Sequence, residues 1–153
     1  MANATNAPVA PYRDEVTPIS KSPAWQAYRI LHWGFTAAPV IAGLDKFTHL
    51  LVDWDKYVAS PVAHLLPFSA HTFMMIVGVV EVVAGLLVAV KPKIGAHVVA
   101  AWLGGIVVNL LLAGGFLDIA LRDFGLALAA LALGRLSLDF DAVGVRARTA
   151  RGR

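Results

Sequence analysis

The chain has 153 residues, of which 58% are hydrophobic and 15% charged, and its mean hydropathy is +0.69. Soluble domains carry about 25% charged residues, so this composition favours a helical bundle in lipid over a soluble core. The sequence contains no cysteine, which excludes disulfide bonds, thiolate catalysis and cysteine-ligated metal sites. Its basic excess lies mainly in the C-terminal tail and in short turns, which fits membrane topology rather than a nucleic-acid surface.

The two ends of the chain differ in composition from its middle. Residues 1–22 are rich in Pro, Asn, Thr and Ser and lack the apolar core of a signal peptide, so we predict a disordered tail. Residues 139–153 are polar and basic, and we predict a second tail there. Residues 23–138 form the predicted membrane domain.

Four apolar segments of this domain are candidates to cross the hydrocarbon core, which is about 30 Å thick. They cover residues 24–44, 70–90, 94–116 and 117–138. The charged turn at residues 118–123 is placed inside the fourth helix, because a helix starting at Phe124 would be too short to cross. The predicted fold is therefore an all-α integral membrane protein, a four-transmembrane-helix bundle.

Orientation is predicted from lysine and arginine in the short loops. Basic residues precede or open the first span, form the turn after the second and follow the fourth: Lys21, Arg29, Lys91, Lys93 and Arg135. These positions share one side of an even-numbered bundle, so both termini are predicted to be cytoplasmic. The expected location is a bacterial-type plasma (inner) membrane, with multiple crossings.

The connection between the first two spans is too apolar for an ordinary loop. Its apolar residues recur at helical spacing: Phe47, Leu50, Leu51, Trp54, Tyr57 and Val58. This pattern predicts an interfacial helix at headgroup level, with Trp54 and Tyr57 as anchors. The alternative is a loop packed over the mouth of the bundle.

One acidic residue interrupts the second span. Residues 73–90 are apolar except for Glu81, whose carboxyl would lie near the bilayer midplane, where an acidic group costs about 2.5–3.5 kcal/mol. We expect Glu81 either to be protonated or to meet a donor such as Asn109, Arg122 or a ligand. A structural interhelical bond and a functional carboxyl are both open interpretations.

The remaining polar residues gather in the outer half of the predicted bundle, with Asp45, Lys46, His49 and His71 at its outer rim. Together they suggest a pocket open to the outer interface, with Glu81 at its floor. The candidate ligand-binding residues are Glu81, Asn109, Arg122, Asp123, Lys46 and His71. Two of them have structural alternatives: Arg122 could form an ion pair with Asp118 or Asp123, and Asn109 could make an interhelical hydrogen bond.

Two histidines inside the predicted spans raise a haem hypothesis. Bis-histidine ligation needs imidazoles that face each other at similar depth, but His32 and His97 differ in depth by roughly 5–6 Å at about 1.5 Å per residue. We therefore do not favour haem, and we predict no other metal site. The chain also lacks the nucleotide-binding loop, the zinc-protease helix and the nucleophile elbow.

Two short motifs resemble those of DoxX-like membrane proteins. The segment Gly43-Leu44-Asp45-Lys46-Phe47 resembles the G-x-x-K-[FL] end of that family's first helix, and residues 78–85 resemble the glycine-flanked glutamate of its second helix. The resemblance extends over residues 24–138. It implies a four-helix fold and, as in some relatives, a small subunit of a membrane oxidoreductase that delivers electrons to quinone. It marks Lys46 and Glu81 as functional residues.

Three functional hypotheses follow from these features. The leading one is an accessory or quinone-pocket subunit of a membrane oxidoreductase, with quinone as the cofactor. The alternatives are a proton-coupled carrier that uses Glu81 and a structural assembly subunit; a b-type cytochrome ranks below them. Whether the chain is itself an enzyme is left open. The expected partners are the lipid bilayer and other membrane subunits or further copies of the chain, and no nucleic acid.

Overall fold

A computed structural model describes the backbone of residues 22–151 and the side chains of residues 22–140. The order of elements is α1 (Pro23–Thr48), η2 (Asp55–Tyr57), α2 (Ser60–Leu65), α3 (Ala70–Val90), α4 (Pro92–Ala113) and α5 (Leu117–Arg151). This part of the chain contains helices and no strand, which confirms the all-α prediction. Residues 1–21 of the predicted N-terminal tail lie outside the described residues, and Ser22 is the N-cap of α1.

Local chemistry explains where the long helices begin and end. Ser22 caps α1 by accepting a hydrogen bond from the backbone N–H of Trp25 at 3.1 Å, and Ser69 caps α3 by accepting from the N–H of Thr72. Lys91 and Pro92 separate α3 from α4, because proline fits the first turn of a helix but not its interior. The positive φ angles of Gly114 and Gly115 make the turn into α5.

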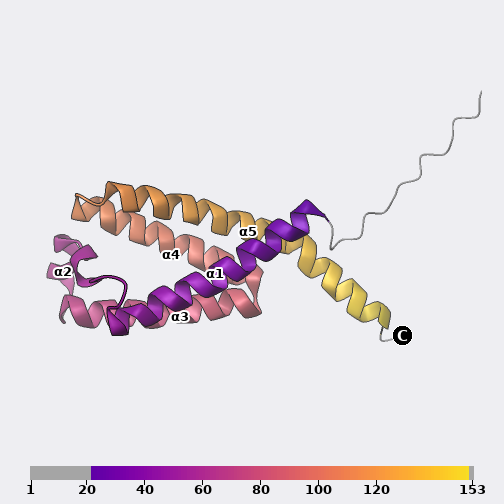
Figure 1. Ribbon diagram of the computed structural model, residues 1–153, viewed down its shortest axis with the longest axis horizontal. Helices are drawn as coiled ribbons and strands as arrows, with labels where there is room; N and C mark the ends of the chain where they lie inside the picture. Colours follow the sequence, from indigo (N-terminus) through magenta and orange to yellow (C-terminus); the bar gives the residue numbers. More distant parts are fainter. Residues whose placement is uncertain (1–21, 152–153) are drawn as a thin grey trace, which may run out of the picture.

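The four long helices pack as two pairs, α1 with α3 and α4 with α5 (Figure 1). The main apolar core lies where these pairs meet, away from α2. It consists of Tyr28, Phe35, Ala84, Val88, Ala96, Val99, Ala100, Ala130 and Leu133. The rings of Trp25 and Phe140 are in edge contact there, with centroids 5.0 Å apart. The start of α1 therefore lies beside α5, at the end of the bundle opposite to α2 (Figure 1).

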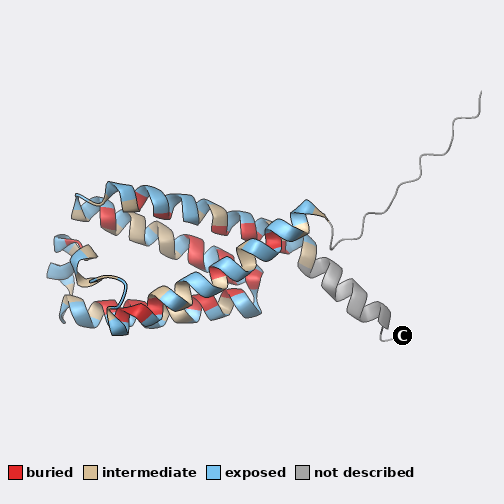
Figure 2. Ribbon diagram, in the orientation of Figure 1, coloured by how far each residue is buried: buried red, intermediate tan, exposed pale blue. Residues whose placement is uncertain are grey.

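Exposed residues run along every long helix (Figure 2), and large apolar side chains are among them on each one. Exposed examples are Ile30 and Trp33 on α1, Val79 and Val83 on α3, Leu111 and Leu112 on α4, and Leu121 and Phe124 on α5. Two helices, α3 and α4, are long and apolar enough to cross a membrane. Helix α3 covers the residues predicted for the second span, whereas α1 and α5 extend beyond the predicted spans, α5 as far as Arg151.

The connection between α1 and α3 differs from the continuous amphipathic helix predicted over residues 47–58. Helix α1 ends at Thr48, irregular backbone follows, and only the short η2 and α2 are helical before Ser69. Tyr57 instead packs its ring edge-on against Phe116, with centroids 5.0 Å apart. The helical spacing was misleading because only part of this set packs onto the bundle: Trp54 and Tyr57 are partly buried, whereas Leu50 and Leu51 are 83% and 70% exposed. This arrangement corresponds to the alternative of a loop over the bundle mouth.

Candidate functional site

Two glycines allow α1 and α3 to approach closely enough to form the site. A β-carbon at Gly43 would lie 2.5 Å from the backbone oxygen of Gly78, and a β-carbon at Gly78 would lie 2.6 Å from the oxygen of Gly43. Both separations are shorter than any carbon–oxygen contact, so only glycine fits at this crossing. Such small-residue crossings are typical of helices that pack in lipid. The crossing lies about one turn from Lys46 on α1 and from Glu81 on α3.

Lys46 and Glu81 form an ion pair inside the bundle. Lys46 Nζ donates to Glu81 Oε2 at 2.5 Å, and the exposed fractions of the two side chains are 3% and 10%. The lysine β-carbon lies beside Gly78, and its flexible stem extends along α3 to the carboxylate. The donor to Glu81 is therefore Lys46, and the predicted partners Asn109 and Arg122 are wrong in this respect. Lys46 is likewise buried and does not lie on the outer rim.

Trp54 covers the ammonium group of Lys46 from the connection. Lys46 Nζ lies 3.8 Å from the centroid of the Trp54 ring, within the range of a cation–π interaction. Trp54 Nε1 donates to Asp45 Oδ2 at 2.7 Å. The connection is therefore attached to the ion pair through an aromatic ring whose position Asp45 fixes.

Asp45 organises the turn that leaves α1. Its Oδ1 atom accepts from the backbone N–H groups of Leu50 and Leu51, each at 3.0 Å, and from the Thr48 hydroxyl at 3.3 Å. Asp45 lies just beyond the predicted first span. Burial raises the pKa of its carboxyl, but the hydrogen bonds from Trp54 and from these neighbours lower that pKa by more than burial raises it. The net pKa is below its ordinary value of 3.8, so Asp45 is ionised at neutral pH.

Helices α4 and α5 each contribute one polar group that acts on Glu81. These are the indole N–H of Trp102, by hydrogen-bond attraction, and the carboxyl of Asp123, by charge repulsion. Trp102 Nε1 is buried and makes no hydrogen bond of standard geometry, which indicates a long or misaligned contact with Glu81. We call Lys46, Trp54, Glu81, Trp102 and Asp123 the central polar cluster.

Arg122 lies outside this cluster. Its side chain is 67% exposed, and its Nε atom donates to Asp123 Oδ1 at 3.3 Å. This contact corresponds to the ion-pair alternative, with Asp123 rather than Asp118 as the partner. Because Asp123 is buried and its neighbour Arg122 is exposed, the arginine offsets charge at the edge of the cluster and does not point into it.

Asn109 fastens the connection to α4. Its Nδ2 atom donates to the backbone oxygen of Tyr57 at 2.7 Å, and its Oδ1 atom accepts from the backbone N–H of Ala59 at 3.1 Å. Both polar ends of the amide are therefore used in holding the segment between η2 and α2. Asn109 has a positioning role and makes neither the predicted contact with Glu81 nor a bond to another helix.

His71 lies at the rim, as predicted, and has two neighbours. Its Nδ1 atom is 3.2 Å from Asp55 Oδ2, and its ring stacks on that of His49, with centroids 5.3 Å apart. These three residues belong to the start of α3, to η2 and to the C-cap of α1. They form a second polar group, distinct in its residues from the central polar cluster.

The two histidines of the haem hypothesis serve different helix pairs. His32 Nε2 donates to the backbone oxygen of Val88 at 3.0 Å across α1 and α3. His97 Nδ1 bonds to the oxygen of Lys93 at 2.7 Å, and its ring packs on Gly134 across α4 and α5. Each imidazole therefore has a local structural role, and the observed contacts do not favour a shared haem.

Sequence reasoning missed four members of these two groups, Trp54, Trp102, His49 and Asp55, and it also missed Asp45, which holds Trp54 in place. Trp54 was interpreted as a membrane anchor and Asp45 as a rim residue, because a sequence does not reveal which side chains fold back. Trp102 is one aromatic residue in an apolar helix and gives no signal by itself.

A comparison of the chain with protein-family models, with curated proteins and with solved structures found no match. The likeness to DoxX-like proteins therefore rests on the short motifs around Lys46 and Glu81 alone.

Proposed function

We propose that this chain is a four-span membrane protein that binds a quinone at the central polar cluster, as a subunit of a membrane oxidoreductase resembling the DoxX-like assemblies. The observation that carries the proposal is the buried Lys46–Glu81 ion pair beside the buried indole N–H of Trp102, which makes no hydrogen bond of standard geometry. The proposed orientation has both termini in the cytoplasm of a bacterial-type cell.

The exposed surface supports four spans rather than the two that hydropathy alone selects. Large apolar side chains point outward from α1 and α5 as well as from α3 and α4. A soluble monomer rarely exposes apolar patches of more than a few hundred Å². Lipid tails covering all four long helices account for this surface. The charges of α1 and α5 that hydropathy counts against them include Lys46 and Asp123, which are buried inside the bundle.

The chemistry of the cluster suits a quinone headgroup. Quinone carbonyl oxygens accept hydrogen bonds, and the cluster holds two suitable donors, the Lys46 ammonium and the Trp102 N–H. Reduction of a quinone to a quinol takes up two electrons and two protons. Glu81 and Lys46 are the groups positioned to exchange those protons, and a redox partner subunit supplies the electrons.

The carrier alternative receives less support from the long helices. Transporter sites are often built from interrupted helices that change conformation during transport, whereas α1, α3, α4 and α5 are each continuous along their length. A carrier would show pH-dependent flux in liposomes that a Glu81→Gln substitution abolishes. The quinone hypothesis predicts no such flux.

The test is equilibrium binding of a radiolabelled short-chain quinone to the full chain in lipid nanodiscs. Trp102→Phe removes the indole N–H together with part of the ring system, and loss of one hydrogen bond worth about 1 kcal/mol should weaken binding at least about fivefold. Trp33→Phe is the matched control, because Trp33 is exposed on the outer surface of α1, and it should bind as the wild type does. Absence of saturable binding, or equal affinity in the two variants, would refute the proposal. Gentle native purification then identifies the partner subunit.

A further inference from the structure

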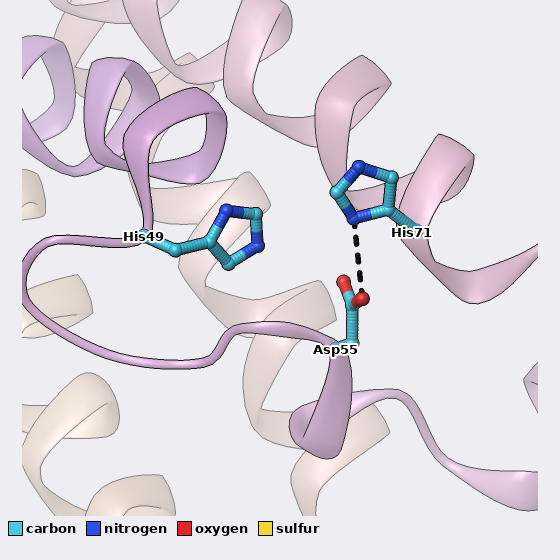
Figure 3. A group of neighbouring side chains, drawn as sticks. All are labelled: His49, Asp55 and His71. Carbon is cyan, nitrogen blue, oxygen red and sulfur yellow. Dashed lines mark hydrogen bonds and ion pairs between the residues drawn. The ribbon is translucent and has the colours of Figure 1, made fainter.

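Three potential metal ligands converge at the end of the bundle that carries α2 (Figure 3). His49 comes from the C-cap of α1, Asp55 from the first residue of η2, and His71 from the first turn of α3. One ligand atom from each residue lies within 4.8 Å of the other two. In Figure 3 both imidazole rings and the carboxylate are turned toward a common centre.

The spacing of these atoms fits a metal ion after small side-chain rotations. A tetrahedral ion with bonds of about 2.0–2.1 Å places neighbouring ligand atoms roughly 3.3 Å apart. His71 Nδ1 and Asp55 Oδ2 are already 3.2 Å apart. The ligand atom of His49 lies within 4.8 Å of the other two, so a rotation about its side-chain bonds would bring it to the same spacing.

The carboxylate has an unused oxygen at the same place. Asp55 Oδ1 is buried and has no hydrogen-bond partner among the described residues. A buried carboxylate oxygen without a partner is costly, and an ion or a bound water is a common reason for one. The interaction with His71 uses only the other oxygen.

The backbone at His49 gives an independent indication. His49 has φ 51° and ψ 34°, and no other non-glycine residue in the described part of the chain has a positive φ. Glycine is the usual residue at such a helix C-terminus, because a side chain there costs about 1–2 kcal/mol. Histidine occupies the position despite this cost, and the left-handed turn directs its ring toward His71 and Asp55 (Figure 3). Strain of this kind is typical of functional positions.

We propose that His49, Asp55 and His71 bind one divalent transition-metal ion, with Zn²⁺ as the reference ion. Two imidazoles and one carboxylate form a donor set found in zinc and non-haem iron sites that keep a position open for water or substrate. His71 is exposed, so that position faces the aqueous side. The ion would also fasten the connection to α3 next to Trp54, which covers the Lys46–Glu81 pair.

The test uses the full chain purified without a histidine tag, with Co²⁺ as a spectroscopic probe and Zn²⁺ as competitor. We expect one Co²⁺ per chain with visible d–d absorption, displacement by Zn²⁺, and a rise in Tm with Zn²⁺. His49→Gly removes the imidazole and relaxes the left-handed backbone, so this variant should fold at least as well as the wild type. His71→Ala removes the second imidazole. Each should weaken Co²⁺ binding more than tenfold, the least that losing even an outer-shell partner usually costs.

His64→Ala is the control, because His64 is an exposed histidine on α2 outside the group. It should bind Co²⁺ with wild-type affinity. The proposal is overturned if the wild type binds no stoichiometric metal, or if His49→Gly and His71→Ala bind it as well as His64→Ala does. In either case the contact between His71 and Asp55 is only a hydrogen bond.

Discussion

Removal of one member of the Lys46–Glu81 pair should be far more damaging than removal of both. The two charges are 2.5 Å apart and almost fully buried. At an effective dielectric constant of 20 their attraction is about 7 kcal/mol, and it opposes a desolvation penalty of several kcal/mol for each ion. The net value of the pair is therefore small, whereas an unpaired charge left behind has no compensation.

These magnitudes give a specific expectation for a double-mutant cycle. Lys46→Met and Glu81→Met should each lower the free energy of unfolding by about 3–5 kcal/mol, because each leaves an isolated buried ion. The double variant should recover most of that loss, because two methionines of similar volume fill the same space without charge. The resulting coupling energy should be at least several kcal/mol, more than is usual for neighbouring residues.

The assay is reversible unfolding by dodecyl sulfate in mixed micelles, followed by far-ultraviolet circular dichroism. Lys93→Met is the control, because Lys93 is exposed at the turn into α4, and it should change stability by no more than about 0.5 kcal/mol. Strictly additive single-variant effects, or single effects below about 1 kcal/mol, would refute the buried pair. If the double variant is stable but no longer binds quinone, the cluster is a binding site and not only a structural one.

Three further predictions test the helix crossing, the connection and the topology. Gly78→Ala should destabilise the protein by about 1–3 kcal/mol through overpacking against the backbone oxygen of Gly43. Gly104 faces open space, so Gly104→Ala should be neutral or stabilising by up to about 1 kcal/mol. Equal effects of the two substitutions in the same unfolding assay would contradict the crossing. Asn109→Ala should cost about 1–3 kcal/mol and speed proteolysis of the connection, so unchanged cleavage would count against its fastening role. The chain contains no cysteine, so a single introduced cysteine reports on which side of the membrane it lies. An impermeant thiol reagent should label Ser60→Cys from outside intact cells and Lys93→Cys only after permeabilisation. The reverse labelling pattern would invert the proposed orientation.

The sequence was most informative about the helices. Long apolar runs separated at Lys91-Pro92 predicted the approximate bounds of α3 and α4, because hydropathy and helix breakers are local properties of the chain. The end of α4 was placed too late, at residue 116, because Gly114 and Gly115 form the turn after Ala113 and do not lie inside the helix. The connection was predicted less well. Its helical periodicity combined residues that fold back, such as Trp54 and Tyr57, with exposed ones such as Leu50, and spacing alone does not distinguish that arrangement from an interfacial helix.

The sequence by itself determined that a carboxyl stands in an apolar helix and therefore needs a partner, because the cost of burying a charge follows from composition and depth alone. Only the tertiary structure decided which partner it has. The crossing at Gly43 and Gly78 places Lys46 beside Glu81, and the folded connection places Asp55 between His49 and His71. Both groups join residues far apart in the chain, and contacts of that kind depend on how the helices pack, which no local pattern specifies.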